Sequence, residues 1–333
     1  MRSPTGADRI RLIAMAISLA VSVGLLGAKY QAYRLTGSTA ILSDALESIV
    51  NVVAAGFAIA ALIFAGRPAD RNHPYGHGKM EFLSAAFEGG LIAFAAVLIV
   101  YEVAQGLLDG VTLRSLDVGV AVVLGAGLVN LALGFFLVRT GRRYDSLTLV
   151  ADGRHVLADF YTSAGIVVGL GLVYLTGLSW LDPLVALVVA FNLMWTGVRV
   201  IRQASAGLLD EEDTALLDRL LVVLEPHLGQ GVIRVHHLRA IRAGRFHHVD
   251  AHLVVPEFWT VERSHELAED LAERVMKELG VDGEMILHTD PCHRIYCRMC
   301  DLDGCPVRRE PFAGRPRLTL DEAVQPDMPR GRP

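Results

Sequence analysis

The sequence predicts an α-helical membrane bundle of six transmembrane helices, followed by a cytoplasmic ferredoxin-like α/β domain. Hydrophobic residues make up 52% of the 333 residues, and the mean hydropathy of +0.40 is too apolar for an ordinary soluble enzyme. Long apolar runs dominate up to about residue 205, whereas charged and histidine residues gather beyond it. We therefore expect a transmembrane domain at 1–205, a cytoplasmic domain at 206–291 and a tail at 292–333.

Six apolar runs account for the predicted spans. Each is about 20 residues or longer, which is enough for a helix to cross a hydrocarbon core of about 30 Å. The first is too long for a signal peptide and no small-residue cleavage site follows it, so we expect it to be retained. The runs lie at about 10–32, 39–65, 82–107, 116–138, 148–176 and 180–201.

Basic residues in the short loops predict the orientation, because cytoplasmic loops carry an excess of Lys and Arg. One side would hold only Lys29, Arg34 and Arg114. The other side would hold Arg2, Arg9, Arg11, Arg67, Arg71, Lys79, Arg139, Arg142, Arg143, Arg199 and Arg202. We expect a multi-pass protein of the cell (inner) membrane with both termini in the cytoplasm. The net charge of −5 and the lack of a basic stripe argue against a nucleic-acid partner.

Two of the predicted spans carry matching polar stripes. Residues at offsets of 0, 3 and 7 fall within about 60° of one another on a helix. Burying polar groups in lipid costs several kcal/mol each, so the stripes should face the bundle interior and one another. The first acid of each stripe, Asp44 or Asp152, either guides an arriving ion or is a helix-start carboxylate at the positive end of the helix dipole. The stripes are Asp44-x2-Glu47-x3-Asn51 and Asp152-x2-His155-x3-Asp159.

The inner four residues of the stripes form a candidate ligand set. Glu47, Asn51, His155 and Asp159 would supply three oxygen ligands and one imidazole. Such a set suits a divalent transition metal. The alternative is that the stripes only join the helices through hydrogen bonds.

The segment DRNHPYGHGKMEF, between the second and third spans, is a second candidate. It places Asp70, His73 and His77 at spacings of three and four. Its proline and glycines argue against a regular helix and predict a structured cytoplasmic turn. The triad is a candidate metal site, with a solvated loop as the alternative. We expect Lys79 and Glu81 to anchor the third helix through polar contacts.

The cytoplasmic domain is predicted to run helix, strand, strand, helix, strand. A helix capped by Asp210 would extend to about His227. VIRVHHLRAIR and FHHVDAHLVVP alternate as strands around an AGR turn, VERSHELAEDLAERVMKELG is an amphipathic helix, and GEMILHTD is a last strand. His248, Asp250 and His252 share one strand face, which is either a ligand face or an ordinary solvated one.

Every cysteine of the chain lies in the segment CHRIYCRMCDLDGC of the tail. A cytosolic location argues against structural disulfides. Four thiols around a central C-x2-C fit tetrahedral zinc or an iron–sulfur cluster. Four reduced bystander thiols are the alternative, although thiols so clustered would oxidise readily. From about Arg308 onward, the richness in Pro, Arg and Gly predicts disorder. The four thiols belong to Cys292, Cys297, Cys300 and Cys305.

Over about residues 10–291, the chain resembles the cation diffusion facilitators, which are six-helix metal exporters with a cytoplasmic metallochaperone-like domain. The loop pattern His-x-x-Gly-His-Gly-Lys-x-Glu carries the resemblance most specifically. The resemblance implies a homodimer, a transport site on helices two and five, and a second, weaker site at the loop triad. It also implies a cytoplasmic binuclear metal site at His236, His252, His265, His288 and Asp290.

The second helix departs from the commonest pattern of that family, in which Asp or His is followed by Asp. Here Glu47 is followed by the neutral Asn51. With Glu47 and Asp159 ionised and His155 neutral, the four ligands balance the charge of one divalent cation. An amide oxygen is also a weaker and harder ligand than a carboxylate. We therefore expect a site that is less exclusive for zinc and more open to iron, manganese or cobalt.

The sequence thus predicts a secondary transporter, and not an enzyme, that exports divalent transition-metal cations in exchange for protons. Protons and metal compete for the same lone pairs of the ligands. Zinc or iron is the expected metal, both as substrate and at the regulatory sites. Two alternatives stay open: a membrane-anchored metal sensor or chaperone, and an electron-transfer protein with an iron–sulfur cluster in the tail. The ligands inside the membrane argue against the sensor.

Overall fold

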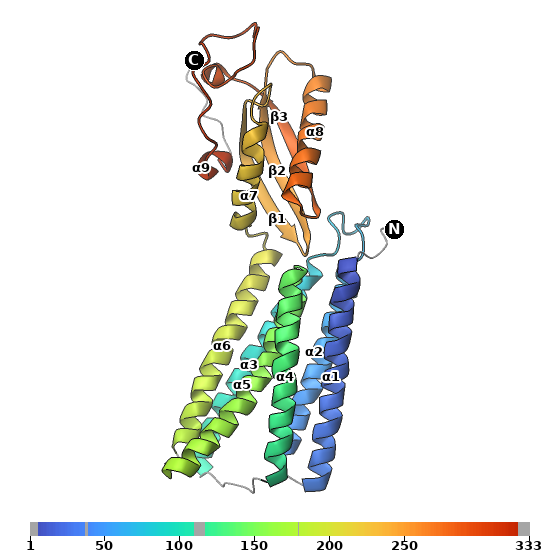
Figure 1. The fold of residues 1–333 in the computed structure, drawn as a ribbon, viewed down its shortest axis with the longest axis vertical. Helices are drawn as coiled ribbons and strands as arrows, with labels where there is room; N and C mark the ends of the chain where they lie inside the picture. Colours follow the sequence, from blue (N-terminus) through green and yellow to red (C-terminus); the bar gives the residue numbers. More distant parts are fainter. Residues whose placement is uncertain (1–5, 37–38, 110–116, 179, 326–333) are drawn as a thin grey trace. The chain divides into compact units, whose positions relative to one another are not determined.

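The computed structural model describes residues 6–36, 39–109, 117–178 and 180–325. The chain divides into two compact units, Met1–Leu209 and Asp210–Pro333, which we term unit 1 and unit 2. Figure 1 shows unit 1 as a bundle of long helices and unit 2 as a small sheet with helices packed on it. The chain is therefore a helical membrane region followed by a small α/β domain.

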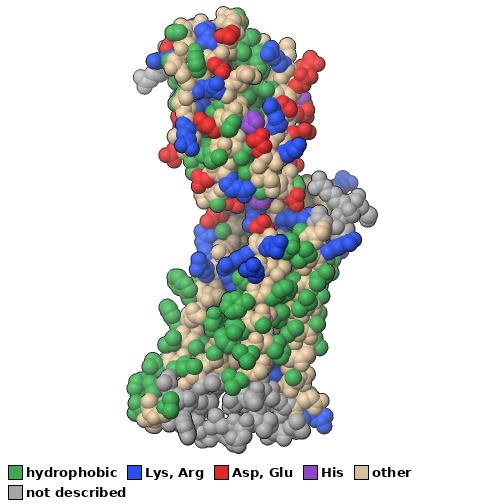
Figure 2. Space-filling model, in the orientation of Figure 1, with side chains coloured by type: hydrophobic (Ala, Val, Ile, Leu, Met, Phe, Trp, Pro, Cys, Tyr) green, Lys and Arg blue, Asp and Glu red, His purple; other side chains and the backbone are tan. Residues whose placement is uncertain are grey.

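Long helices make up the described part of unit 1. Four of them contain stretches long and apolar enough to cross a membrane, at Gly6–Gln31, Met80–Gln105, Leu124–Arg143 and Pro183–Leu208. A shorter apolar stretch covers Asn51–Ala65. Hydrophobic side chains cover the middle of unit 1, and blue Lys and Arg side chains gather at one end of it (Figure 2). The helices are α1 (Gly6–Thr36), α2 (Thr39–Ala65), α3 (Met80–Asp109), α4 (Asp117–Arg143), α5 (Leu147–Thr176) and α6 (Leu181–Leu208).

The helices of unit 1 pack closely where small residues face each other. Helix α3 lies along α6, α4 along α5, and α1 along α2. At Gly197 of α6, a Cβ atom would lie 2.8 Å from the backbone N of Ala93 and 2.8 Å from the backbone O of Gly89. Glycine is therefore required for the backbones of α3 and α6 to come this close. Helix α2 contacts α5, which brings the two polar stripes together.

Unit 2 has its elements in the order that the sequence predicts. They are α7 (Thr214–Leu224), β1 (Arg234–Ala243), β2 (Phe246–Val255), α8 (Val261–Leu279) and β3 (Gly283–Pro291). The strand order is β1-β2-β3, with β1 and β2 antiparallel and β2 and β3 parallel. Alternate residues of the strands, with the apolar faces of α7 and α8, form the core of this unit.

The first helix of unit 2 starts and ends differently from the prediction. Asp213, and not Asp210, is the N-cap, because its side chain accepts a hydrogen bond of 3.0 Å from the backbone N of Leu216. The α-helix ends at Leu224, and a 3-10 turn carrying a proline covers Glu225–His227. Proline lacks the backbone N–H that a longer α-helix would need.

The tail is folded as far as Gln325, where the sequence predicts disorder from about Arg308 onward. A 3-10 turn (η2, Arg294–Tyr296) follows β3, and a short helix (α9, Leu320–Ala323) lies near its end. Leu318 is 3% exposed and packs into the core of unit 2. Thr319 and Glu322 form a capping box on α9. These local and tertiary contacts outweigh the disorder-promoting composition.

Candidate metal centres

The stripe on α2 meets the stripe on α5 inside unit 1. The Nδ2 of Asn51 donates a hydrogen bond to Oδ2 of Asp159, and Oδ1 of Asn51 lies 2.9 Å from Nε2 of His155. All three side chains are buried, with 9% or less of their surface exposed. Three of the four predicted ligands are therefore in direct contact. The side chains of Glu47 and Asp44 lie outside the described residues.

These hydrogen bonds define the protonation of the cluster. A carbonyl oxygen can only accept, so the contact with Asn51 places a hydrogen on Nε2 of His155. The other ring nitrogen, Nδ1, is buried and has no hydrogen-bond partner among the described residues. The cluster thus holds a carboxylate, an amide and an imidazole with one unused lone pair. These are ligand types that bind a divalent transition metal.

Asp152 is a buried residue within α5 and does not lie at the start of the helix. It is 1% exposed and accepts a hydrogen bond of 2.7 Å from the hydroxyl of Ser18 on α1. The first turn of α5 carries no acidic residue, so the dipole interpretation of Asp152 is wrong. Its carboxylate instead links α5 to α1.

A third buried acid, Glu88 on α3, was missed by the sequence analysis. It is 0% exposed, and neither carboxylate oxygen has a hydrogen-bond partner among the described residues. It lies close enough to Asp152 and Asp159 to interact with both electrostatically. A signal was present, because Glu81, Ser84 and Glu88 repeat the offsets of 0, 3 and 7 that mark the other two stripes.

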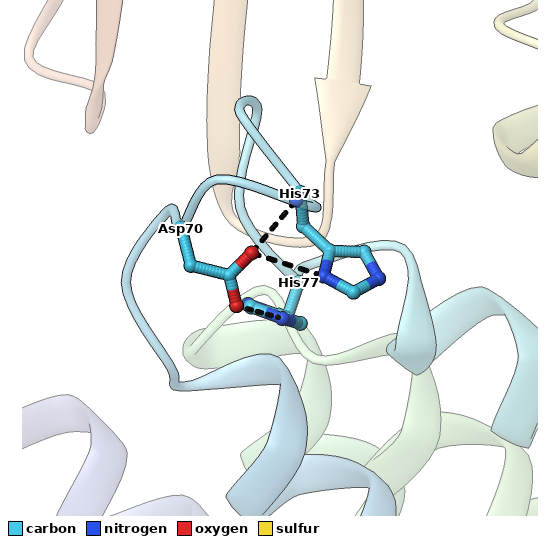
Figure 3. A group of neighbouring side chains, drawn as sticks. All are labelled: Asp70, His73 and His77. Atoms are coloured by element: carbon cyan, nitrogen blue, oxygen red, sulfur yellow. Dashed lines mark hydrogen bonds and ion pairs between the residues drawn. The ribbon is translucent and has the colours of Figure 1, made fainter.

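The loop after α2 brings its predicted triad together, as Figure 3 shows. Asp70 lies between the two histidines, with Oδ1 3.2 Å from Nδ1 of His73 and Oδ2 3.4 Å from Nε2 of His77. One ligand atom from each residue falls within 4.8 Å of the others. The Nδ1 of His77 is buried and has no partner among the described residues. The backbone N–H of His73 is the main cause that lowers the pKa of Asp70, so the carboxylate is ionised at neutral pH.

The predicted anchoring role of Glu81 is confirmed by its contacts at the start of α3. Its Oε1 accepts a hydrogen bond of 3.0 Å from Arg11 of α1, and its Oε2 accepts one of 2.7 Å from Ser146, just before α5. Arg11 also donates to the backbone O of Tyr144. Glu81 therefore joins three segments of unit 1 next to the loop triad.

A third group lies on the face of the unit 2 sheet opposite its core. Nε2 of His236 is 3.0 Å and Nδ1 of His252 is 2.9 Å from Oδ2 of Asp290. Pairing of the strands sets this arrangement, because His252 is the register partner of both His236 and His288. His288 is 67% exposed and lies 3.3 Å from Oδ1 of Asp290. Burial raises the pKa of Asp290, but hydrogen bonds with His252 and His236 outweigh this and hold it below its ordinary value.

Two histidines of unit 2 differ from the prediction. His265 lies on α8, where it is 66% exposed and pairs with Glu269 at 3.3 Å, so the described chain does not bring it to the group around Asp290. His237, which the sequence analysis passed over, contacts the group, since its Nδ1 is 3.3 Å from Nε2 of His252. A bulge in β1 with a φ of 50° at His237 causes this, and no sequence pattern indicates it.

The four cysteines of the tail surround one small cavity behind the end of β3. All four are free thiols, with Cys300 buried and the others half-buried. The cavity has a volume of about 10 Å³. The sulfur atoms are more widely spaced than the other two ligand groups, since no three of them lie within 4.8 Å of one another. Burial raises the pKa of the Cys292 thiol.

Comparisons with known proteins agree on one family. Residues 15–209 match the model of the cation efflux transmembrane domain, and residues 216–292 match that of the cation efflux protein cytoplasmic domain. An uncharacterised transporter of Synechocystis sp. is 38% identical over 83% of this chain and 88% of its own length. Metal tolerance protein C1 of Arabidopsis thaliana is 30% identical over 86% of this chain and 64% of its own length. The cation-efflux pump FieF of Pectobacterium carotovorum is 28% identical over 85% of this chain and 93% of its own length.

Proposed function

Because the chain belongs to the cation diffusion facilitator family of metal-efflux transporters, we propose that it exports divalent transition-metal cations from the cytoplasm in exchange for protons. The observation that carries this proposal is the buried contact of Asn51 with His155 and Asp159. Burying polar groups where two apolar helices meet is costly, and groups kept there despite the cost mark an ion pathway.

In this proposal, the cluster is the transport site and Glu47 completes it. An ion that binds Asp159 and Asn51 must break the hydrogen bond between them, and His155 offers a neutral ring nitrogen. Protons compete for the same atoms, since a protonated carboxylate or imidazolium loses its lone pair to the proton. Proton entry from outside would therefore eject the ion, and metal entry from the cytoplasm would expel the protons.

The metal substrates we propose are zinc and iron, with manganese and cobalt accepted as well. Glu47 and Asp159 as carboxylates balance one divalent cation, and the amide of Asn51 adds a hard, neutral oxygen. Such a mixed set of oxygen and nitrogen ligands discriminates weakly between these ions.

The other two groups are proposed to be regulatory. The loop triad of Asp70, His73 and His77 would bind a second ion close to the cytoplasmic entrance. The group around Asp290 on the sheet of unit 2, with His288, would bind metal and draw two copies of the chain into a homodimer. Metal bound there would lower the free energy of the transport-competent state, so unit 2 would act as a sensor of metal concentration.

The topology we propose has six spans, with α2 and α5 crossing the membrane beside the four helices with the longest apolar stretches. The protein would lie in the inner membrane of the cell. Both termini would be in the cytoplasm, because loops rich in Lys and Arg favour that side. Unit 2 would be a ferredoxin-like domain, in keeping with its two helices and its antiparallel and parallel strand pairs.

Transport by reconstituted protein tests the proposal directly. Proteoliposomes with an imposed pH gradient would be given Zn²⁺, Fe²⁺, Mn²⁺ or Co²⁺, and metal uptake and internal pH would be recorded together. Wild-type protein should couple metal movement to an opposite proton flux, and Asp159→Ala should abolish both. Asp270→Ala, which removes an exposed carboxylate of α8, is the control and should transport normally. Metal movement that persists in Asp159→Ala would rule out this site.

A further inference from the structure

The segment after β3 is held against the strands of unit 2. The backbone N of Cys292 donates a hydrogen bond of 2.8 Å to the backbone O of Val255. Cys300 packs in a small apolar cluster with Ile233, Val254 and Tyr296. The cytoplasmic-domain match ends at residue 292, so the rest of the cysteine segment is an addition to the part of the chain that the family models cover.

Four cysteines from three short pieces of this segment converge on one cavity. Cys292 directly follows β3, Cys297 and Cys300 come after η2, and Cys305 follows a turn at Gly304. The turn needs a glycine, because Gly304 has a φ of +67°. All four residues line the same cavity of about 10 Å³. That volume is about one water-sized sphere.

The backbone around the cavity is fixed from one side by Arg308. Its guanidinium donates to the backbone O of Cys300 at 3.0 Å, of Leu302 at 2.7 Å and of Cys297 at 3.2 Å. The next residue, Arg309, places its backbone N 3.5 Å from Sγ of Cys297. An N–H directed at a sulfur is a common outer-shell partner of a metal-bound thiolate, because it stabilises the negative charge.

We propose that Cys292, Cys297, Cys300 and Cys305 bind one zinc ion as a tetrathiolate site, separate from the transport site and from the histidine groups. Zinc prefers four tetrahedral ligands in structural sites, with Zn–S bonds of about 2.3 Å. Sulfur atoms around such an ion lie about 3.8 Å apart, so the thiols close inward when the ion binds. The guanidinium of Arg308 offsets part of the negative charge that four thiolates bring.

The small cavity favours a single ion over an iron–sulfur cluster. A cluster adds several iron and sulfide atoms between the thiolates, whereas this cavity holds about one small sphere. Single-ion occupancy also gives the site a structural role. The ion would tie the end of β3 to the loop that leads into the folded tail, in which Arg234 pairs with Glu322 and Leu318 enters the core.

Metal binding by the full chain in detergent tests the proposal. The background would be the variant Asp70→Ala, Asp159→Ala, Asp290→Ala, which removes a carboxylate from each of the other three groups. We expect this variant to retain one tightly bound Zn²⁺ per chain, and Co²⁺ in its place to give a thiolate-to-cobalt charge-transfer absorption band. Adding Cys297→Ser and Cys300→Ser should remove both the ion and the band.

Thiol reactivity of the unmutated chain gives a second measurement that requires no variant. After reduction and chelation, all four thiols should react with a disulfide reagent, and Zn²⁺ should slow that reaction at least tenfold. Equal rates with and without Zn²⁺, together with no sulfur-to-cobalt band, would overturn the site. Acid-labile sulfide and visible iron–sulfur absorption would overturn the assignment of a single ion.

Discussion

Replacing Glu88 by methionine is expected to stabilise unit 1 and to weaken transport at the same time. The carboxylate is fully buried, and neither of its oxygens has a hydrogen-bond partner among the described residues. Each buried polar atom without a partner costs about 1–3 kcal/mol, so the two oxygens together cost about 2–6 kcal/mol. Methionine has a similar length and carries neither oxygen. The melting temperature of the variant should therefore rise by several degrees.

Transport should fall because the same substitution removes a carboxyl group close to Asp159. Losing an interaction worth about 1.4 kcal/mol lowers a rate about tenfold, so we expect a drop of about that size. Thermal unfolding of the detergent-purified chain at low metal and uptake into proteoliposomes would be compared. A buried acid kept at the expense of stability is expected at a functional site.

Two further variants make this comparison specific. Ser84→Ala removes a single buried hydroxyl without a partner, four residues before Glu88 on α3. It should stabilise the chain by a smaller amount and leave transport unchanged. Glu88→Gln keeps a polar group of the same size but removes the acid, so it should lower transport without the full gain in stability. A methionine variant that melts at or below the wild-type temperature and transports normally would refute the reasoning.

Four other substitutions test separate parts of the molecule. Asn51→Asp adds a carboxylate to the cluster and should tighten Zn²⁺ binding in titration calorimetry; an unchanged metal preference would contradict the role of the amide. Glu81→Ala leaves Arg11 buried without its carboxylate and should cost about 3–5 kcal/mol, which thermal unfolding would detect. Leu318→Ala should cost unit 2 about 2–5 kcal/mol, because the side chain is 3% exposed in its core; no loss would mean that the tail is not packed there. The lowered pKa of Asp290 stabilises unit 2 above the unfolded-state pKa of about 3.9, and this contribution disappears as pH falls through the folded-state value. Asp290→Asn should remove that part of the acid dependence of unfolding.

The helical repeat of polar residues in the sequence was enough to predict features that depend on a single helix. The stripes on α2 and α5 follow from the helical repeat, and the contact of Asn51 with His155 and Asp159 follows from burying both stripes. The same repeat on α3 went unused, because its first member, Glu81, was assigned to anchoring and its second, Ser84, is a weak polar signal. Glu88 was therefore left as an isolated acid in an apolar run.

Features that depend on tertiary contacts were less visible in the sequence. The bulge that turns His237 toward His252 depends on the strand register, and composition alone cannot indicate it. The folded tail was missed because its Pro, Arg and Gly content favours disorder. The pattern Thr319-x2-Glu322 is a helix-start signal that argues otherwise. His265 lies apart from the sheet group because α8 packs on the core face of the sheet, whereas the group lies on the opposite face.

The amide of Asn51 is both a hydrogen-bond donor and a hydrogen-bond acceptor, and this affects the expected rate of the transport cycle. It donates a hydrogen bond to Asp159 and accepts one from His155. The three side chains therefore satisfy one another when no ion is bound. A carboxylate at this position would repel the carboxylate of Asp159 during the step in which the empty transporter returns. If the cluster is the transport site, as proposed, the amide would bind the ion less tightly than a carboxylate but would make the return of the empty transporter easier.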